Sequence, residues 1–213
     1  MPRKLRIFIP NQPQHVVVRG HNRNPILMCD NDFQFLYQCL YEAAEKHNLS
    51  VHAWVFMNNH LHLLVTPATA EALPRTMQST GRRYAYYFNR TYQRSGALWQ
   101  DRYKSSPVDT ENYLLACYRY IELNPVRANI VRQPENYIYS SYHANALEKP
   151  DKLVTPHPVF LAFFNSKQKR KAYIELCQQS LSTKELENIR KGTEKGIGIG
   201  QADFLIRVAK LTA

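Results

Sequence analysis

The 213-residue chain has a formal net charge of +11 and contains 44% hydrophobic and 21% charged residues. This hydrophobic content is sufficient for a folded core, and the excess of lysine and arginine favours a polyanionic partner, most commonly a nucleic acid. Four scattered cysteines without C-x-x-C spacing argue against a zinc ribbon or disulfide framework, and no stretch suits a signal peptide or membrane span, so we expect a reduced, cytoplasmic, soluble protein.

The first two thirds of the chain alternate between strand and helix patterns. β-branched or alternating runs predict strands, and apolar residues spaced three and four apart predict helices. The predicted elements are a strand over 14–21, a helix to about 47 capped by Asp30 or Asn31, hairpin strands over 49–56 and 60–66, a helix over 70–92, an extended segment over 97–109 and a helix to about 123. This order predicts an α+β, ferredoxin-like sandwich in which helices pack on one face of a largely antiparallel sheet.

The composition changes after residue 147. Residues 148–158 contain proline and lysine and resemble a linker, and the remainder is basic with helical patterns over 166–179, over 183–191 and from about Gln201. We therefore predict a first domain over residues 1–147 and a basic, mostly helical C-terminal extension over 148–213.

His60 and His62 flank Leu61 in the second strand of the predicted hairpin. Residues i and i+2 of a strand project to the same face, so both imidazoles point the same way from a rigid element. Unpaired imidazoles among apolar neighbours are costly, and a bound divalent metal would remove that cost. The pattern predicts a metal site, although two structural histidines satisfied by water or backbone are the alternative.

Tyr120 and Asn124 lie one turn apart on one side of the predicted helix that precedes Pro125. A free phenol has a pKa near 10 and is a weak nucleophile, so it needs a metal or base nearby. Together with the two histidines, these residues could break a phosphodiester bond. Tyr118 and Glu122 form a rival pair with the same spacing, which the sequence does not exclude.

Candidate nucleic-acid contacts are cationic and aromatic side chains outside the apolar stripes. Cations can contact phosphates, and rings can stack on unpaired bases; a solvated helix face is the alternative. The candidates are Arg19, His21 and Arg23 after the first strand, Arg75, Arg82, Arg83, Tyr86 and Arg90 on the long helix, and Arg102 and Lys104 near Trp99.

Four segments resemble the REP-associated tyrosine transposases, which belong to the HUH single-strand transposases with one catalytic tyrosine. They are HVVVRGHNR (15–23), WVFMNNHLHLLV (54–65), LWQDRY (98–103) and YRYIELNPVRANIV (118–131). The segments follow in the order and spacing of the family, and the resemblance covers most of residues 5–147.

The resemblance implies a role for each candidate residue. His60 and His62 match the histidines that hold the metal, Asn124 matches a third, polar ligand, and Tyr120 matches the nucleophile. It implies that Mg²⁺ or Mn²⁺ polarises the scissile phosphate while Tyr120 attacks, which leaves a 5′-phosphotyrosine and a free 3′-hydroxyl. The expected partner is single-stranded or hairpin DNA of the repetitive extragenic palindrome (REP) type, in the nucleoid, for a monomer or a homodimer.

Two other functions fit part of the pattern. A non-catalytic nucleic-acid-binding module could stack bases on such a sheet, but it would not need the histidines or Tyr120. A metal nuclease that activates water would keep the histidines without needing the tyrosine.

Overall fold

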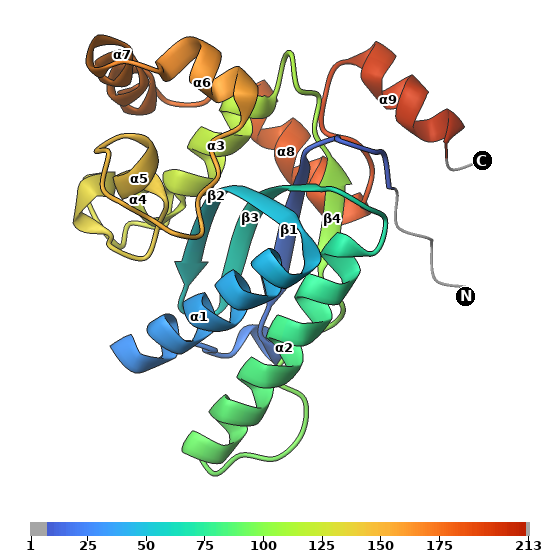
Figure 1. The fold of residues 1–213 in the computed structure, drawn as a ribbon, viewed down its shortest axis with the longest axis vertical. Helices are drawn as coiled ribbons and strands as arrows, with labels where there is room; N and C mark the ends of the chain where they lie inside the picture. Colours follow the sequence, from blue (N-terminus) through green and yellow to red (C-terminus); the bar gives the residue numbers. More distant parts are fainter. Residues whose placement is uncertain (1–7, 212–213) are drawn as a thin grey trace.

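A four-stranded antiparallel sheet with the order β2-β3-β1-β4 forms the centre of the computed structural model, which describes residues 8–211 (Figure 1). The strands are β1 (Gln14–Arg19), β2 (Leu49–Met57), β3 (His60–Pro67) and β4 (Lys104–Pro107). Helix α1 (Asp30–His47) connects β1 to β2, and α2 (Ala72–Thr91) connects β3 to β4. This order and connectivity confirm the predicted ferredoxin-like sandwich.

The strand register places polar side chains on one face of the sheet. In β1, Val17 lies opposite His62 and Arg19 lies opposite His60 of β3. Because neighbouring residues across a ladder point to the same side, the histidines share a face with His15, which lies two residues before Val17. The intervening residues of both strands are apolar and point to the opposite face.

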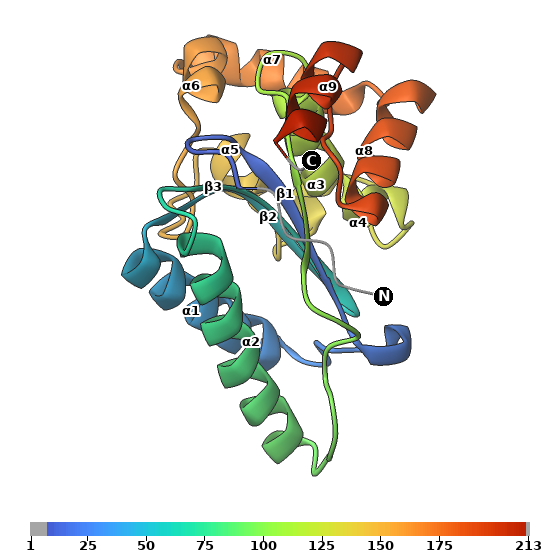
Figure 2. The ribbon, with the colours of Figure 1, turned by 90° about the vertical axis from the view of Figure 1, so that its right-hand side faces the viewer.

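Helices α1 and α2 cover that apolar face (Figure 2). Their buried side chains, such as Leu36 of α1 and Phe88 of α2, pack with Val16 and Leu63 of the sheet. The predicted cap of α1 at Asp30 or Asn31 is wrong, since the N-cap is Cys29. The reason is that the Asp32 carboxylate accepts hydrogen bonds from the backbone N–H groups of residues 28 and 29, which closes the first turn.

The other face of the sheet is covered as well, by α3 (Leu114–Glu122) and the C-terminal half of the chain (Figure 2). The sequence predicts helices on one face, whereas the structure has helices on both. Every residue of α3 from Ala116 to Glu122 is buried, because the helix lies between the sheet and the later helices. Val55 and Leu64 of the sheet therefore share a core with residues of α3 and with Phe160 and Tyr173.

The C-terminal half consists mostly of short helices. They are α4 (Asn124–Arg127), α5 (Tyr142–Asn145), α6 (Pro158–Phe164), α7 (Lys167–Gln178), α8 (Thr183–Lys195) and α9 (Ala202–Lys210), and the 3-10 turns η1 (His21–Arg23) and η2 (Pro134–Asn136) complete the chain. The last three helices agree with the predicted helical segments. The division of the chain at residue 147 stays a prediction.

Both outer edges of the sheet are covered by later segments. Ser140 and Val154 form bridges to β2, and the backbone N–H of Thr155 donates to the carbonyl of Val51 at 2.7 Å. At the other edge, Ile199 pairs with Val108 just beyond β4. Backbone groups at these positions of the outer strands are therefore satisfied within the chain.

Residues 1–7, where we expect no signal peptide, lie outside the described residues. Within residues 8–211, none of the helices combines the length and the apolar character that crossing a bilayer requires.

Candidate active site

His60 and His62 project from β3 into the space between the sheet and α3. Their ring centroids are 5.0 Å apart and the rings are nearly perpendicular. His62 is 5% exposed, and His60 is half-buried. Burial lowers the pKa of His60 to about 4, with a smaller effect from Arg19, and lowers the pKa of His62 well below its usual value. Both imidazoles are therefore neutral near pH 7, which is the form that binds a metal.

The proton position on His60 follows from its neighbour. Its Nδ1 lies 2.6 Å from Oδ1 of Asn59, and the amide Nδ2 of Asn59 donates to the carbonyl of Arg23 at 3.1 Å. The amide is thus oriented so that its oxygen faces the ring, and Nδ1 of His60 must carry the proton. The lone pair on Nε2 of His60 is left free for a ligand.

His62 contacts a third histidine that we did not assign from the sequence. Nδ1 of His62 lies 3.0 Å from Nε2 of His15, and the two rings are stacked with centroids 5.1 Å apart. Nδ1 of His15 in turn lies 2.9 Å from Oγ1 of Thr193 on α8. Burial, with a smaller contribution from Arg127, lowers the pKa of His15 to about 3, so this ring is neutral too.

Tyr120 lies on the side of α3 that faces the histidines. Its ring is edge-on to those of His62 and His15, with centroids 5.8 and 5.7 Å away. The guanidinium of Arg127 lies over the phenol ring. The structure thus brings the candidate nucleophile and both candidate metal ligands together.

The rival pair points elsewhere. The hydroxyl of Tyr118 accepts from the backbone N–H of His157 at 3.2 Å, and its ring stacks on Phe160. Glu122 is fully buried, and its carboxylate accepts hydrogen bonds from the side chains of Ser141, Asn145 and Tyr173. Both residues belong to the core between α3 and the C-terminal helices.

Asn124 is the half-buried first residue of α4. The helix axis breaks at Leu123, and Pro125 then occupies the first turn of a new helix, where its missing N–H costs nothing. No described hydrogen bond joins the Asn124 side chain to His60 or His62, so its role as a ligand stays a prediction. Within residues 8–211, no three His, Cys, Asp or Glu side chains form a cluster that could hold a metal. Two neutral imidazoles and an amide oxygen still suit a divalent ion that keeps open positions.

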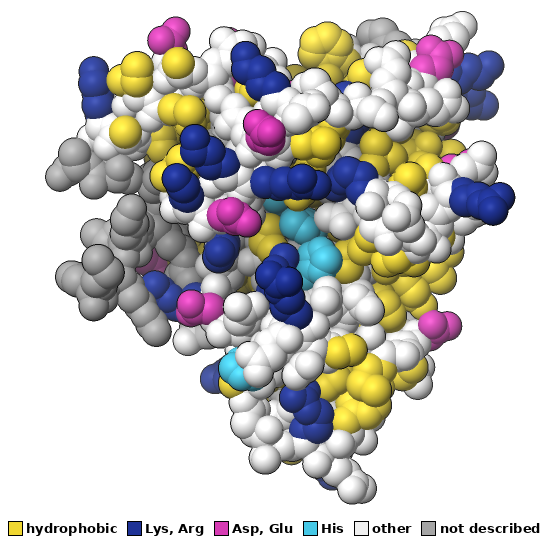
Figure 3. Space-filling view, turned by 180° about the vertical axis from the view of Figure 1, so that it is seen from behind, with side chains coloured by type: hydrophobic (Ala, Val, Ile, Leu, Met, Phe, Trp, Pro, Cys, Tyr) yellow, Lys and Arg dark blue, Asp and Glu magenta, His cyan; other side chains and the backbone are white. Residues whose placement is uncertain are grey.

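A cavity of about 420 Å³ opens beside Tyr120 and His62. Figure 3 shows histidine surface near the centre of this side of the molecule, bordered by lysine and arginine side chains. The cavity is lined by two acidic residues, Asp101 and Glu194, which are outnumbered by four basic residues, Arg19, Arg102, Lys104 and Arg190. Three of these four basic residues are predicted nucleic-acid contacts, and their charge favours a phosphate in the cavity.

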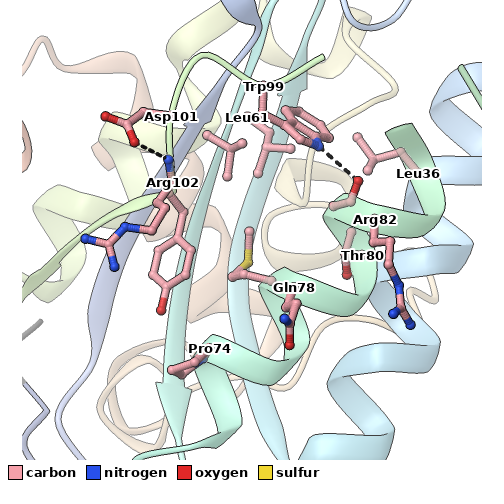
Figure 4. A pocket seen from close by; sticks show the side chains of 13 residues that line it. Leu36, Leu61, Pro74, Gln78, Thr80, Arg82, Trp99, Asp101 and Arg102 are labelled. Carbon is pink, nitrogen blue, oxygen red and sulfur yellow. Dashed lines mark hydrogen bonds between the residues drawn. The ribbon is translucent and has the colours of Figure 1, made fainter. Parts of the chain in front are cut away.

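A second cavity of about 460 Å³ lies between α2 and the loop before β4 (Figure 4). Arg82 and Arg102 border it, and Nε1 of Trp99 donates to the carbonyl of Gly81 at 2.9 Å, which holds the indole against α2. Because Arg102 lines both cavities, they are neighbours on the surface.

The remaining candidate nucleic-acid contacts differ in their exposure and in whether their side chains already bind another residue of the protein. His21 and Arg23 are exposed in η1. Arg75 pairs with Glu71 at 3.7 Å, and Arg90 donates to the hydroxyl of Tyr86 at 3.3 Å, all at the surface. Arg83 instead forms an ion pair with Glu42 of α1 at 2.7 Å, which links the two helices of the apolar face.

Four residues near the site were not assigned from the sequence, namely His15, Arg127, Arg190 and Thr193. His15 could have been found, because it alternates with Val17 and Arg19 on one strand and so shares their face. The two residues on α8 carry no such signal, since only the tertiary fold brings that helix to the sheet.

A family model described as "Transposase IS200 like" matches residues 9–124, which is more than half of the chain. A solved structure of a REP-associated tyrosine transposase bound to a REP hairpin aligns with a TM-score of 0.56 and 18% sequence identity, covering 74% of this chain and 93% of that chain. A proposed transposase from Deinococcus radiodurans R1 aligns with a TM-score of 0.40 and 21% identity, covering 63% of this chain and 97% of that chain. No curated protein matches the sequence.

Proposed function

We propose that this chain, which belongs to the family of IS200-like transposases, cuts and rejoins single-stranded DNA through a covalent bond to Tyr120. The observation that carries the proposal is the position of the Tyr120 phenol. It lies beside His62 at a cavity whose lining carries more basic than acidic side chains, where a phosphate could bind.

In the proposed reaction, the phenol oxygen of Tyr120 attacks the scissile phosphorus and gives up its proton. The bond between phosphorus and the 3′ oxygen breaks, and its electron pair stays on that oxygen, which takes up a proton. The products are a 5′-phosphotyrosine and a free 3′-hydroxyl. The reverse step with another 3′-hydroxyl rejoins strands without an external energy source, because the phosphodiester is exchanged rather than hydrolysed.

His60 and His62 would hold a divalent ion, Mg²⁺ or Mn²⁺, through their Nε2 atoms, with Asn124 as a third ligand. The neutral state of both rings and the free Nε2 of His60 support this assignment. When bound, such an ion would neutralise charge on the phosphate and orient it for attack.

We further propose that the DNA partner is a hairpin with a single-stranded flank, of the REP type, and that the protein acts on it in the nucleoid. The basic side chains Arg19, Arg102, Lys104 and Arg190 at the cavity support a phosphate backbone there. The solved relative of similar fold was bound to a REP hairpin.

Covalent trapping tests the function. The protein is incubated with labelled hairpin DNAs taken from repeats that flank its gene, with Mg²⁺, with Mn²⁺ or with EDTA, and is run on a denaturing gel. We expect a metal-dependent adduct that is absent in Tyr120→Phe and present in Tyr118→Phe, a matched variant of a buried tyrosine on the same helix.

Other outcomes would identify a different function. Cleavage without an adduct would indicate a nuclease that activates water. Specific binding with neither product would indicate a non-catalytic module.

A further inference from the structure

We infer that His15 and Thr193 are positioning residues for the proposed metal site, because together they determine which ring nitrogen of His62 carries the proton. The inference rests on the proposed function, since it takes His62 to be a metal ligand. Three hydrogen bonds carry it: Thr193 Oγ1 to the carbonyl of Ile189 at 2.7 Å, His15 Nδ1 to Thr193 Oγ1 at 2.9 Å, and His62 Nδ1 to His15 Nε2 at 3.0 Å. We call this set the Thr193–His15–His62 chain.

The direction of the chain is fixed at its α8 end. A carbonyl oxygen can only accept, so the single hydroxyl proton of Thr193 is used in the bond to Ile189. The hydroxyl oxygen must then accept from His15, which places the ring proton of His15 on Nδ1. A neutral imidazole has one ring proton, so Nε2 of His15 is an acceptor.

The same logic then applies to His62. Its Nδ1 must donate to Nε2 of His15, and its own Nε2 is left with a free lone pair. If the chain ran in the opposite direction, the proton of His62 would lie on Nε2, and that nitrogen could not bind a metal. The direction of the chain therefore decides whether His62 can serve as a ligand.

Burial makes this control effective. His15, the central residue of the chain, has an exposed fraction of 0%, and its two partners His62 and Thr193 reach solvent only at the cavity beside Tyr120, with exposed fractions of 5% and 9%. Both proposed ligands carry their ring proton on Nδ1. Asn59 fixes that proton on His60, and His15 fixes it on His62. Thr193 comes from α8, so the C-terminal segment contributes to the metal site although it supplies no ligand.

The direction of the Thr193–His15–His62 chain can be measured in the wild-type protein without metal or DNA, and a substitution is needed only to assign the signal. In protein labelled with ¹⁵N-histidine, long-range ¹H–¹⁵N correlation spectra distinguish a ring with its proton on Nδ1 from one with its proton on Nε2. We expect His62, assigned by its loss in His62→Ala, to have its proton on Nδ1. A proton on Nε2 of His62 would overturn the inference.

The consequence for the metal is measured by Mn²⁺ binding to the protein without DNA, with electron paramagnetic resonance of the free ion. Thr193→Val removes the hydroxyl at nearly constant volume and should weaken binding roughly 10- to 100-fold, whereas Thr193→Ser should restore it. The matched control is Ser106→Ala. Ser106 lies beside His15 in the sheet, and its hydroxyl donates to the carbonyl of Gly192 on α8. It is therefore a buried serine near the site that takes no part in the Thr193–His15–His62 chain.

Each outcome is informative. Mn²⁺ affinity of a folded Thr193→Val within about threefold of the wild type would overturn the inference, as would an equal loss in Ser106→Ala. If Thr193→Val does not fold, the spectrum of the wild-type protein decides. If the wild type and His60→Ala both fail to bind Mn²⁺, the proposed metal site fails, and the proton position on His62 still tests the hydrogen-bond chain by itself.

Discussion

The guanidinium of Arg127 lies over the ring of Tyr120, with Cζ 4.3 Å from the ring centroid, and its Nη2 donates to the backbone carbonyl of the same tyrosine. Burial lowers the pKa of Arg127 to about 10, so it remains a cation at neutral pH. A cation against the ring favours the edge-on orientation of the phenol towards His62, and in the proposed reaction it would stabilise negative charge that develops on the phenol.

We therefore expect Arg127→Gln to slow adduct formation at saturating DNA by roughly 100-fold, and Arg127→Lys to slow it less. The affinity for hairpin DNA should change less than threefold, because the side chain is directed at Tyr120. Single-turnover gel assays and filter binding measure the two effects. Arg119→Gln is the matched control, since this buried arginine on α3 donates to the carbonyl of Gln179. A parallel loss of rate and affinity would show instead that Arg127 contacts DNA.

The Glu122 carboxylate ties α3 to the C-terminal helices. Tyr173 donates to Oε2 of Glu122 at 2.6 Å, and both side chains are completely buried. Tyr173→Phe removes the donor without leaving a large cavity, so we expect the free energy of unfolding to fall by about 1–3 kcal/mol.

Urea denaturation is followed by circular dichroism and by intrinsic fluorescence. For each protein, wild type and variant, the two signals should report the same single transition, which lies at lower urea concentration in the variant. Tyr86→Phe, at a tyrosine that is 69% exposed, should change stability little. Separate transitions would mean that the C-terminal segment unfolds as an independent unit.

Stability should decrease on acidification because of buried histidines such as His52. Burial, with a smaller contribution from His157, lowers the pKa of His52 to about 4, although its bond to the carbonyl of Thr155 partly opposes the shift. Between pH 6.5 and 4 the unfolded chain binds a proton at this residue and the folded chain does not. The contribution of His52 to the free energy of unfolding is therefore complete above pH 6.5, and about 3 kcal/mol of it is lost as the pH falls to 4.

The free energy of unfolding, measured by urea denaturation at several pH values, should show this dependence, and His52→Gln should make it shallower. Glu122, whose pKa is raised mainly by burial, acts in the opposite direction in the acidic range. An identical pH dependence in the variant and the wild type would contradict the assignment to His52.

Two adjacent arginines of α2 should behave differently towards DNA. Arg82 is exposed and borders the cavity beside Trp99, whereas Arg83 pairs with Glu42. We expect Arg82→Gln to weaken hairpin binding and to reduce the slope of log affinity against log salt by about 0.7–0.9. Arg83→Gln should leave binding unchanged and lower stability by roughly 0.2–1 kcal/mol. Fluorescence anisotropy at several salt concentrations measures the slope for each variant. An equal slope of log affinity against log salt in both variants would show that Arg82 and Arg83 do not differ in DNA binding.

The order of strands and helices could be predicted from the sequence because α1 and α2 each have one buried side, and the strands are short runs rich in β-branched residues that are bounded by turns. A period-3.6 pattern of apolar residues marks a helix with one buried side, whereas a continuous apolar run marks a strand that is buried on both faces. The position of α3 could not be predicted from such a pattern, because this helix is buried on all sides between the sheet and the C-terminal helices. Its sequence fits a helix but does not say which face meets the sheet.

The candidate site was predictable in part for a related reason. His60, His62 and Tyr120 lie within short local patterns, and the structure brings them together. The contacts of Arg127 and Thr193 depend on where α4 and α8 dock, which is a property of tertiary packing. Local spacing contains no information about a contact between residues 178 positions apart, such as that of His15 with Thr193.

The pairing of Ile199 beside β4 has a consequence for the order of events during protein synthesis. A chain that emerges from the ribosome N-terminus first can form β1 to β4 long before residue 199 is available. During that interval the outer edge of β4 is open to pairing with other chains, and the brevity of the strand, four residues, limits this risk. The same delay means that α8 reaches the face of the sheet that carries His62 after α3, so a nascent chain has the proposed nucleophile Tyr120 in place before the cavity beside it is complete.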